Sequence, residues 1–153
     1  NYLRLVDNHL QANVGGPFPG VVKLLDDLAA LPDAPAIALL TGNIEEGAKR
    51  KLGTYGIWDR FAFGGFANDN EDRNLIAAAA KAKGSEYLER PLEGNEIVVI
   101  GDTPKDVACG KFIEARTLGV ATGGASLDEL VACTPDWAVP DLTHLTAAEI
   151  CGR

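Results

Sequence analysis

Residues 98–107 have the sequence VVIGDTPKDV, and this stretch decides which kind of fold the chain adopts. The continuous, β-branched apolar run over residues 97–100 predicts a buried strand. Thr103 is a typical N-cap and Pro104 a typical first helical residue, so a helix is expected over residues 104–114. The stretch therefore predicts a buried strand that leads directly into a helix.

The same alternation of short apolar runs and helical patterns continues on both sides of this stretch. Further strands are predicted over residues 36–40, 61–66, 116–120 and 137–139, and helices over residues 1–14, 21–31, 44–54, 72–83 and 127–132. Strands without in–out alternation that are each followed by a helix indicate a parallel sheet covered on both faces. The predicted fold class is α/β with a Rossmann-like sheet, whose functional groups lie beyond the carboxyl ends of the strands.

Length, charge and cysteine content limit the classes of function. The 153 residues fit one domain, and 14 Lys and Arg against 22 Asp and Glu give a formal net charge of −8. This charge provides no basic surface for nucleic acid or for an anionic membrane. Three widely spaced cysteines, Cys109, Cys133 and Cys151, form no disulfide framework, which indicates a reducing, cytoplasmic setting. We expect no nucleic-acid or membrane partner, and a homo-oligomer is left open.

Two carboxylates follow the strand over residues 97–100. Asp102 comes directly after it, and Asp106 lies one helical turn further on. Two carboxylates, water and a substrate phosphate form the usual oxygen site for Mg²⁺, so Asp102 and Asp106 are predicted metal ligands. A purely structural interpretation is that Thr103 and Asp106 only cap the helix.

A second candidate site follows the strand over residues 36–40. Thr41 offers a hydroxyl, Gly42 allows close approach to a ligand, and Asn43 opens a helix whose free N–H groups can hold an anion. We therefore predict phosphate binding by these three residues. The alternative is that Asn43 is an ordinary N-cap, with Glu46 completing a capping box.

A phosphate site also needs a cation, and three side chains are candidates. Arg73 lies at the start of a predicted helix, in the sequence EDRN, while Lys51 and Lys83 lie on neighbouring helices. A basic residue on a helix is ordinarily a solvated surface charge. The sequence alone leaves the choice open.

These motifs, in this order, resemble the haloacid dehalogenase-like (HAD-like) hydrolase superfamily, in particular its phosphoglycolate-phosphatase-like branch. The matching segments within residues 17–150 are LLTGN (39–43), DRN (72–74), VVIGDTPKD (98–106), RTLGVATGG (116–124) and DWAVPDL (136–142). The resemblance implies a parallel sheet in the order 5-4-1-2-3. It also implies that Thr41 and Arg73 act catalytically on the phosphoryl group, with Gly42 and Asn43 beside them. It assigns Mg²⁺ to Asp102 and Asp106.

The family's first motif, DxDx[TV] at the end of strand 1, is absent. Its first aspartate is the nucleophile and its second the general acid and base. No Asp-x-Asp follows an apolar strand here, and Asp7 lies within a helical pattern. We therefore expect the nucleophile to lie outside this chain.

The missing motif also affects the expected domain organisation. Residues 1–14 are expected to be the remnant of a helical cap domain, and residues 15–153 a core that lacks its first strand. Because that strand is central, its absence leaves a gap in the sheet with unpaired backbone groups. The alternative is that another segment or another chain fills the gap.

The resemblance implies a Mg²⁺-dependent phosphatase of small phosphorylated metabolites that forms an aspartyl-phosphate intermediate. The 153 residues alone are expected to be inactive. Three alternatives stay open: a metal-free haloacid dehalogenase, a phosphosugar mutase, or a binding domain without catalysis.

Overall fold

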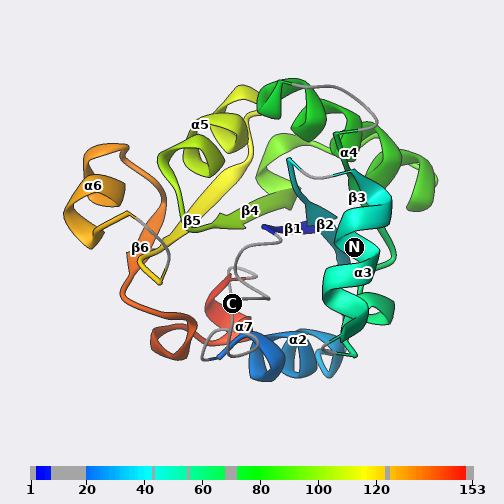
Figure 1. Cartoon of the computed structure of the whole chain (residues 1–153), viewed down its shortest axis with the longest axis horizontal. Helices are drawn as coiled ribbons and strands as arrows, with labels where there is room; N and C mark the ends of the chain where they lie inside the picture. Colours follow the sequence, from blue (N-terminus) through cyan, green and yellow to red (C-terminus); the bar gives the residue numbers. More distant parts are fainter. Residues whose placement is uncertain are drawn as a thin grey trace.

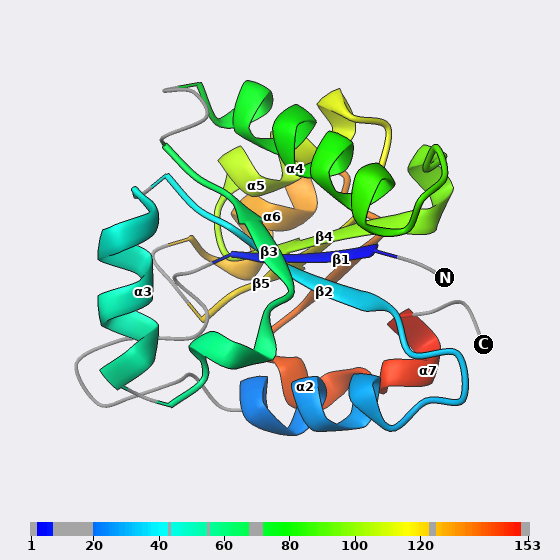
Figure 2. The same ribbon diagram turned by 90° about the vertical axis from the view of Figure 1, so that its right-hand side faces the viewer.

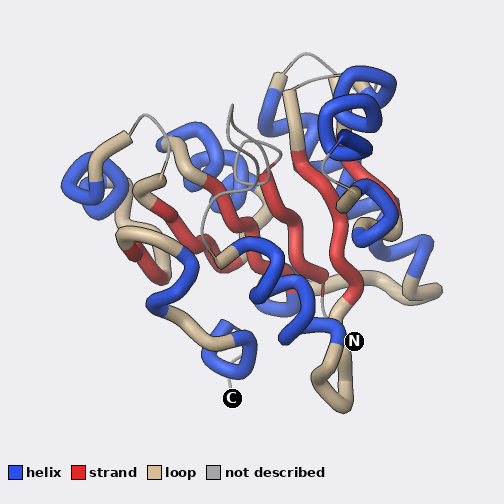
Figure 3. The backbone as a smooth tube through the Cα atoms, turned by 60° about the horizontal axis from the view of Figure 1, so that its bottom comes forward, coloured by secondary structure: helices blue, strands red, loops and turns tan. Residues whose placement is uncertain are grey.

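A six-stranded parallel sheet forms the centre of the computed structural model (Figures 1 and 3). The structure describes residues 3–7, 20–42, 44–54, 56–67, 72–122 and 125–150. The strand order is β3-β2-β1-β4-β5-β6, and every neighbouring pair is parallel. The strands are β1 (Leu3–Asp7), β2 (Ala36–Leu40), β3 (Phe63–Gly65), β4 (Ile97–Gly101), β5 (Arg116–Val120) and β6 (Trp137–Val139). The predicted α/β class and parallel sheet are confirmed.

Helices cover both faces of this sheet. In Figure 2, α4 and α5 lie above the sheet and α2 and α7 below it, while α3 lies beside β2 and β3. The helices are α2 (Val21–Ala29), α3 (Glu45–Thr54), α4 (Arg73–Tyr87), α5 (Pro104–Phe112), α6 (Leu127–Ala132) and α7 (Ala147–Ile150). Three short 3₁₀ turns complete the described elements: η1 (Trp58–Arg60), η2 (Gly94–Glu96) and η3 (Leu142–His144).

The core consists of two main apolar layers, because successive strand residues point to opposite faces. From β4, Val98 and Ile100 pack with α2, while Ile97 and Val99 pack on the side of α4 and α5. All five residues of β4 are buried. A strand buried on both faces needs apolar residues at every position, which explains its unbroken sequence.

The helix predicted over residues 1–14 is wrong for residues 3–7. These residues form β1, which pairs with β2 on one side and β4 on the other. Residues 8–14 lie outside the described part of the chain. A five-residue segment does not fix its own conformation, and pairing on both sides favours the strand. The structure thus attaches residues 3–7 to the core sheet and not to a cap helix.

The expected gap at the centre of the sheet is likewise wrong. The segment Leu3–Asp7 fills it, as the alternative interpretation allowed, so the backbone groups of β2 and β4 have partners. The order 5-4-1-2-3 implied by the resemblance is present, with β6 added at the outer edge of β5.

None of the described helices is both long and apolar enough to cross a membrane.

Candidate active site

The carboxyl ends of β1, β2 and β4 meet at one edge of the sheet. Thr41 follows β2 and is buried, and its backbone N–H donates to the Gly65 carbonyl at 3.1 Å. Asp102 follows β4 and is also buried. Asp7 is the last residue of β1 and is in register with Leu40. The parallel register therefore gathers the two predicted sites at one edge.

The turn after β4 is held by the carboxylate of Asp106. Its Oδ2 accepts hydrogen bonds from the backbone N–H groups of Asp102 and Thr103, each at 3.1 Å. The Thr103 hydroxyl donates to the same oxygen at 3.0 Å and accepts from the Asp106 N–H at 3.3 Å. This is a complete capping box at the start of α5, so Thr103 and Asp106 do cap this helix.

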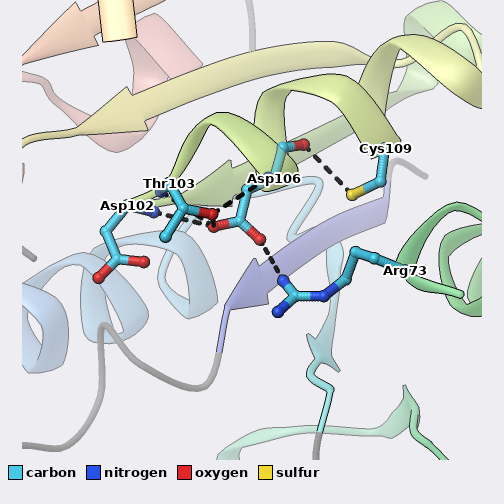
Figure 4. Close-up of polar contacts among 5 residues, drawn as sticks. All are labelled: Arg73, Asp102, Thr103, Asp106 and Cys109. Atoms are coloured by element: carbon cyan, nitrogen blue, oxygen red, sulfur yellow. Dashed lines mark hydrogen bonds and ion pairs between the residues drawn. The ribbon is translucent and has the colours of Figure 1, made fainter. Parts of the chain in front are cut away.

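Arg73 reaches the other oxygen of the same carboxylate. Its Nη1 lies 2.5 Å from Asp106 Oδ1, and the Asp106 side chain is only 1% exposed (Figure 4). Arg73 is the first residue of α4, after the N-cap Asp72, whose side chain accepts from the Asn74 N–H at 2.8 Å. The ion pair joins the starts of α4 and α5, and the opposite charge offsets the cost of burying Asp106.

Gly42 lies beside this ion pair. A Cβ atom built on Gly42 would lie 3.5 Å from Arg73 Nη2, so the backbone after β2 and the guanidinium are neighbours. Of the predicted phosphate-binding residues, the structure thus places Gly42 and Arg73 together, with Thr41 adjacent in the chain. Asn43 lies outside the described residues.

The other two candidate cations are differently placed. Lys83 donates to the Gly64 carbonyl at 2.8 Å, at the edge strand β3. Lys51 lies in the last turn of α3, at the opposite end of that helix from the Thr41–Gly42 turn. Among the three candidates, Arg73 is the one with a described contact to Asp106.

A cavity of about 470 Å³ opens beside Arg73. Its lining consists of Gly42, Asp72, Arg73, Asn74, Lys105 and Ala108, which come from the turn after β2 and the starts of α4 and α5. The sequence analysis missed Asn74 and Lys105. Their only sequence signal is their position next to motif residues, because the cavity forms where two helices distant in sequence meet.

The comparisons with known proteins concern the fold. Residues 73–145, which include Arg73, Asp102 and Asp106, match the model of the HAD-hydrolase-like family. The chain therefore has a HAD-like hydrolase fold. The predicted resemblance is confirmed. No curated protein matches the chain in sequence.

Solved structures show the same fold across most of this HAD-like chain. A predicted phosphatase from Clostridium acetobutylicum is 17% identical with a TM-score of 0.73, over 90% of this chain and 61% of that one. A predicted phosphoglycolate phosphatase from Haemophilus somnus is 18% identical with a TM-score of 0.69, over 86% and 55%. A β-phosphoglucomutase from Clostridium difficile is 19% identical with a TM-score of 0.71, over 89% and 55%. The chain therefore spans less than two thirds of the length of these structures, and identities this low establish the fold alone.

The described residues of the HAD-like chain fit a Mg²⁺ ion that takes few protein ligands. Mg²⁺ commonly keeps several waters and binds one or two carboxylates together with a substrate phosphate. Asp102 offers a carboxylate that is 3% exposed, and Figure 4 shows it turned away from the Asp106 carboxylate. Both oxygens of Asp106 are engaged by Arg73 and by the turn. Within the described residues, no three His, Cys, Asp or Glu side chains form a group that could hold a metal.

The two predicted metal ligands thus have different surroundings. Asp102 is the carboxylate suited to direct contact with the ion, and Asp106 is the group that holds the turn and Arg73 in place. A hydrogen-bonded group behind a ligand typically orients that ligand. The assignment of Mg²⁺ to this pair stays a prediction.

Gly101→Ala is expected to destabilise the protein by about 2 kcal/mol or more, because the new methyl group overlaps the Asp106 side chain. Three atoms of that side chain occupy the space, and its hydrogen bonds prevent it from moving away. Urea unfolding measures the change. The control is Gly53→Ala in α3, where the new methyl group meets no atom within 4 Å, and stability is expected to rise slightly. Equal stability of the two variants would contradict the tight turn at Gly101.

Proposed function

We propose that the protein is a Mg²⁺-dependent phosphatase of small phosphorylated metabolites that acts through an aspartyl-phosphate intermediate. The observation that carries the proposal is the Arg73–Asp106 ion pair, which lies beside Gly42 at the sheet edge where Asp102 follows β4. A cation, a backbone turn and a buried carboxylate at one edge suit a phosphate ester. Two of the similar solved structures are described as a predicted phosphatase and a predicted phosphoglycolate phosphatase.

The phosphoryl group is bound by residues from two elements. The hydroxyl of Thr41, the backbone of Gly42 and the side chain of Asn43 hold its oxygens after β2. Arg73 supplies positive charge from the start of α4, and Asp106 fixes the guanidinium through the ion pair. Groups held in place before the reaction stabilise developing charge without a cost of reorganisation.

Asp102 holds the metal, and Asp106 positions Asp102 by accepting its backbone N–H. When bound, Mg²⁺ neutralises phosphate charge and so lets an anionic nucleophile approach. The chain's own contribution is to fix the carboxylate of Asp102 at the end of a fully buried strand. A strand buried on both faces moves little, so the ligand keeps its place.

The reaction has two displacements at phosphorus. An aspartate carboxylate attacks, the P–O bond to the metabolite breaks, and the metabolite leaves with a proton from a general acid. Water then attacks the aspartyl phosphate, which releases inorganic phosphate and regenerates the carboxylate. The expectation that this aspartate lies outside the chain rested on a missing central strand. Because Leu3–Asp7 fills that strand, we propose Asp7, its last residue, as the attacking carboxylate.

Asp7 provides the test of that last point. The structure places it at the carboxyl end of the central strand, but the sequence that follows is Asn8-His9 and not x-Asp. In the protein expressed from its complete reading frame, Asp7→Asn is expected to abolish the aspartyl phosphate, because an amide cannot act as the nucleophile. A base-labile, hydroxylamine-sensitive phosphorylated protein that persists in that variant would show that another residue is the nucleophile and overturn our placement.

The function itself is tested with a panel of small phosphate monoesters, with Mg²⁺ and with a chelator. Phosphate release that stops with the chelator supports the proposal. Chelator-resistant release of halide from 2-haloacids would indicate a dehalogenase, and an isomeric phosphosugar product a mutase. Phosphate binding without any turnover would indicate a binding domain. Each of these three outcomes contradicts the proposed phosphatase.

We further propose a cytoplasmic protein whose partner is the metabolite alone, with no nucleic-acid or membrane partner. Cys109 is a thiol that donates to the Asp106 carbonyl at 3.2 Å, and Cys133 is a free thiol, which suits a reducing compartment; Cys151 lies outside the described residues. A homo-oligomer stays an open prediction, and the mass in solution decides it.

A further inference from the structure

A second cavity, of about 400 Å³, lies between α3, η1 and the edge strand β3. The start of α3, both ends of β3 and the middle of α4 contribute to its lining. None of its described lining residues lines the cavity beside Arg73, so the two spaces are separate. A volume of this size fits a small ligand.

The walls of this second cavity are aromatic. Trp58, Phe61, Phe63 and Phe66 line it, and they are four of the ten aromatic residues of the chain. The ring centroids of Trp58 and Phe66 are 6.3 Å apart, a spacing at which aromatic pairs attract each other. Phe66 is buried, but the other three rings are only half-buried. They therefore leave apolar surface that a ligand can cover.

Three charged side chains line the same cavity, and two of them are acidic. Glu45 and Asp59 are exposed carboxylates from α3 and η1. Asp59 makes no hydrogen bond or ion pair with any residue in the part of the chain that the structure describes. Lys83, the third group, donates its ammonium to the Gly64 carbonyl at 2.8 Å. The lining thus has an excess of negative charge, and the group available to a ligand is a carboxylate.

The lining already holds one cation against an aromatic ring. Lys83 Nζ lies 5.6 Å from the centroid of the Phe66 ring, at which distance an ammonium is attracted by the electrons of the ring face. Its hydrogen bond also occupies the Gly64 carbonyl of the edge strand, which disfavours pairing with a strand from a partner. The half-buried Trp58 ring, next to Asp59 in the chain, offers a similar surface to a second cation.

We propose that this cavity binds a small amphipathic cation, which has an aromatic or alkyl body and an ammonium group. The body covers the half-buried rings, and the ammonium lies between those rings and the Asp59 carboxylate. An aromatic face and a carboxylate together offset the loss of water around an ammonium. The inference is independent of the proposed phosphatase, because it uses no residue of the site around Asp102 and Arg73.

The test compares three ligands that share a phenyl ring: 2-phenylethylamine, a cation at neutral pH, 2-phenylethanol, which is uncharged, and the anion 3-phenylpropionate. Trp137→Phe leaves Trp58 as the one tryptophan of the chain, so its emission reports binding in this cavity. The amine is expected to change that emission saturably and to bind roughly three- to tenfold more tightly than the alcohol. Adding Asp59→Asn is expected to weaken the amine by roughly two- to fivefold and to leave the alcohol unchanged.

The matched control is Asp128→Asn, which removes the same charge from an exposed position on α6. It is expected to retain the full preference for the amine. The proposal is overturned if Trp58 emission does not respond to the amine, if the amine and the alcohol bind equally, or if Asp59→Asn keeps the full preference. Tighter binding of 3-phenylpropionate would assign the cavity to anions through Lys83 and would overturn it as well. None of these outcomes bears on the proposed phosphatase, which the phosphate monoester panel tests separately.

Discussion

In the protein expressed from its complete reading frame, Asp102→Asn is expected to lower kcat for Mg²⁺-dependent phosphate release by about 10³-fold. The substitution keeps the size of the side chain and removes its charge at the end of a buried strand. A neutral amide binds Mg²⁺ poorly, because the ion prefers carboxylate oxygen. Initial rates measured across a Mg²⁺ titration separate weaker metal binding from a lower maximal rate.

The comparison variants for this prediction are Asp106→Asn and Asp128→Asn. Asp106 holds the turn and Arg73, so its loss is expected to lower metal affinity by roughly 10- to 100-fold and to reduce stability as well. Asp128 lies in the first turn of the short helix α6, on another element, and its replacement is expected to change neither quantity. Wild-type turnover in Asp102→Asn would disprove the metal assignment.

Local sequence predicted the parts of the fold in which one segment fully specifies its own structure. The strand at residues 36–40 and the strand at residues 116–120 have the predicted bounds, and β4 extends one residue beyond its predicted end. Most residues of each run are apolar or β-branched, and each run is buried along most or all of its length. The start of α5 was equally predictable, because Thr103 and Pro104 set the cap through contacts within four residues.

The central strand was not predictable in this way. Leu3, Val6 and Leu10 have the spacing of a helix. Residues 3–7, taken alone, also fit a strand. What distinguishes the two conformations is pairing with residues 36–40 and 97–100, more than thirty positions away. Conformations that depend on long-range partners override local periodicity.

The candidate site likewise contains residues that one short motif predicts and residues that only long-range contacts bring in. Asp102 and Asp106 belong to one short motif, and their positions at the sheet edge follow from that motif and the parallel topology. Arg73 contacts Asp106 across 33 positions, and Lys105 reaches the same cavity from another helix. Spacing along the chain carries no information about such contacts, so Arg73 was one of three candidate cations and Lys105 was missed.

Arg4→Glu is expected to destabilise the protein by about 3 kcal/mol or more. Arg4 lies in β1 with its side chain fully buried. Its Nη1 donates to the Glu96 carbonyl at 3.2 Å and its Nη2 to the Ile150 carbonyl at 3.5 Å, which ties the central strand to η2, just before β4, and to α7. A carboxylate at this position would face those carbonyl oxygens, and its burial without a donor is costly.

Urea unfolding of three variants measures this effect. Arg4→Met keeps the length of the side chain without a charge and is expected to cost less than Arg4→Glu, because buried ion-to-hydrophobic changes are often tolerated. Arg50→Glu makes the same reversal of charge on the exposed face of α3 and is expected to have little effect. If Arg4→Glu unfolds at the wild-type urea concentration, Arg4 is not buried and residues 3–7 do not form the central strand. The slot between β2 and β4 would then need another strand, and Asp7 would no longer lie at the edge of the sheet where Thr41 and Asp102 meet.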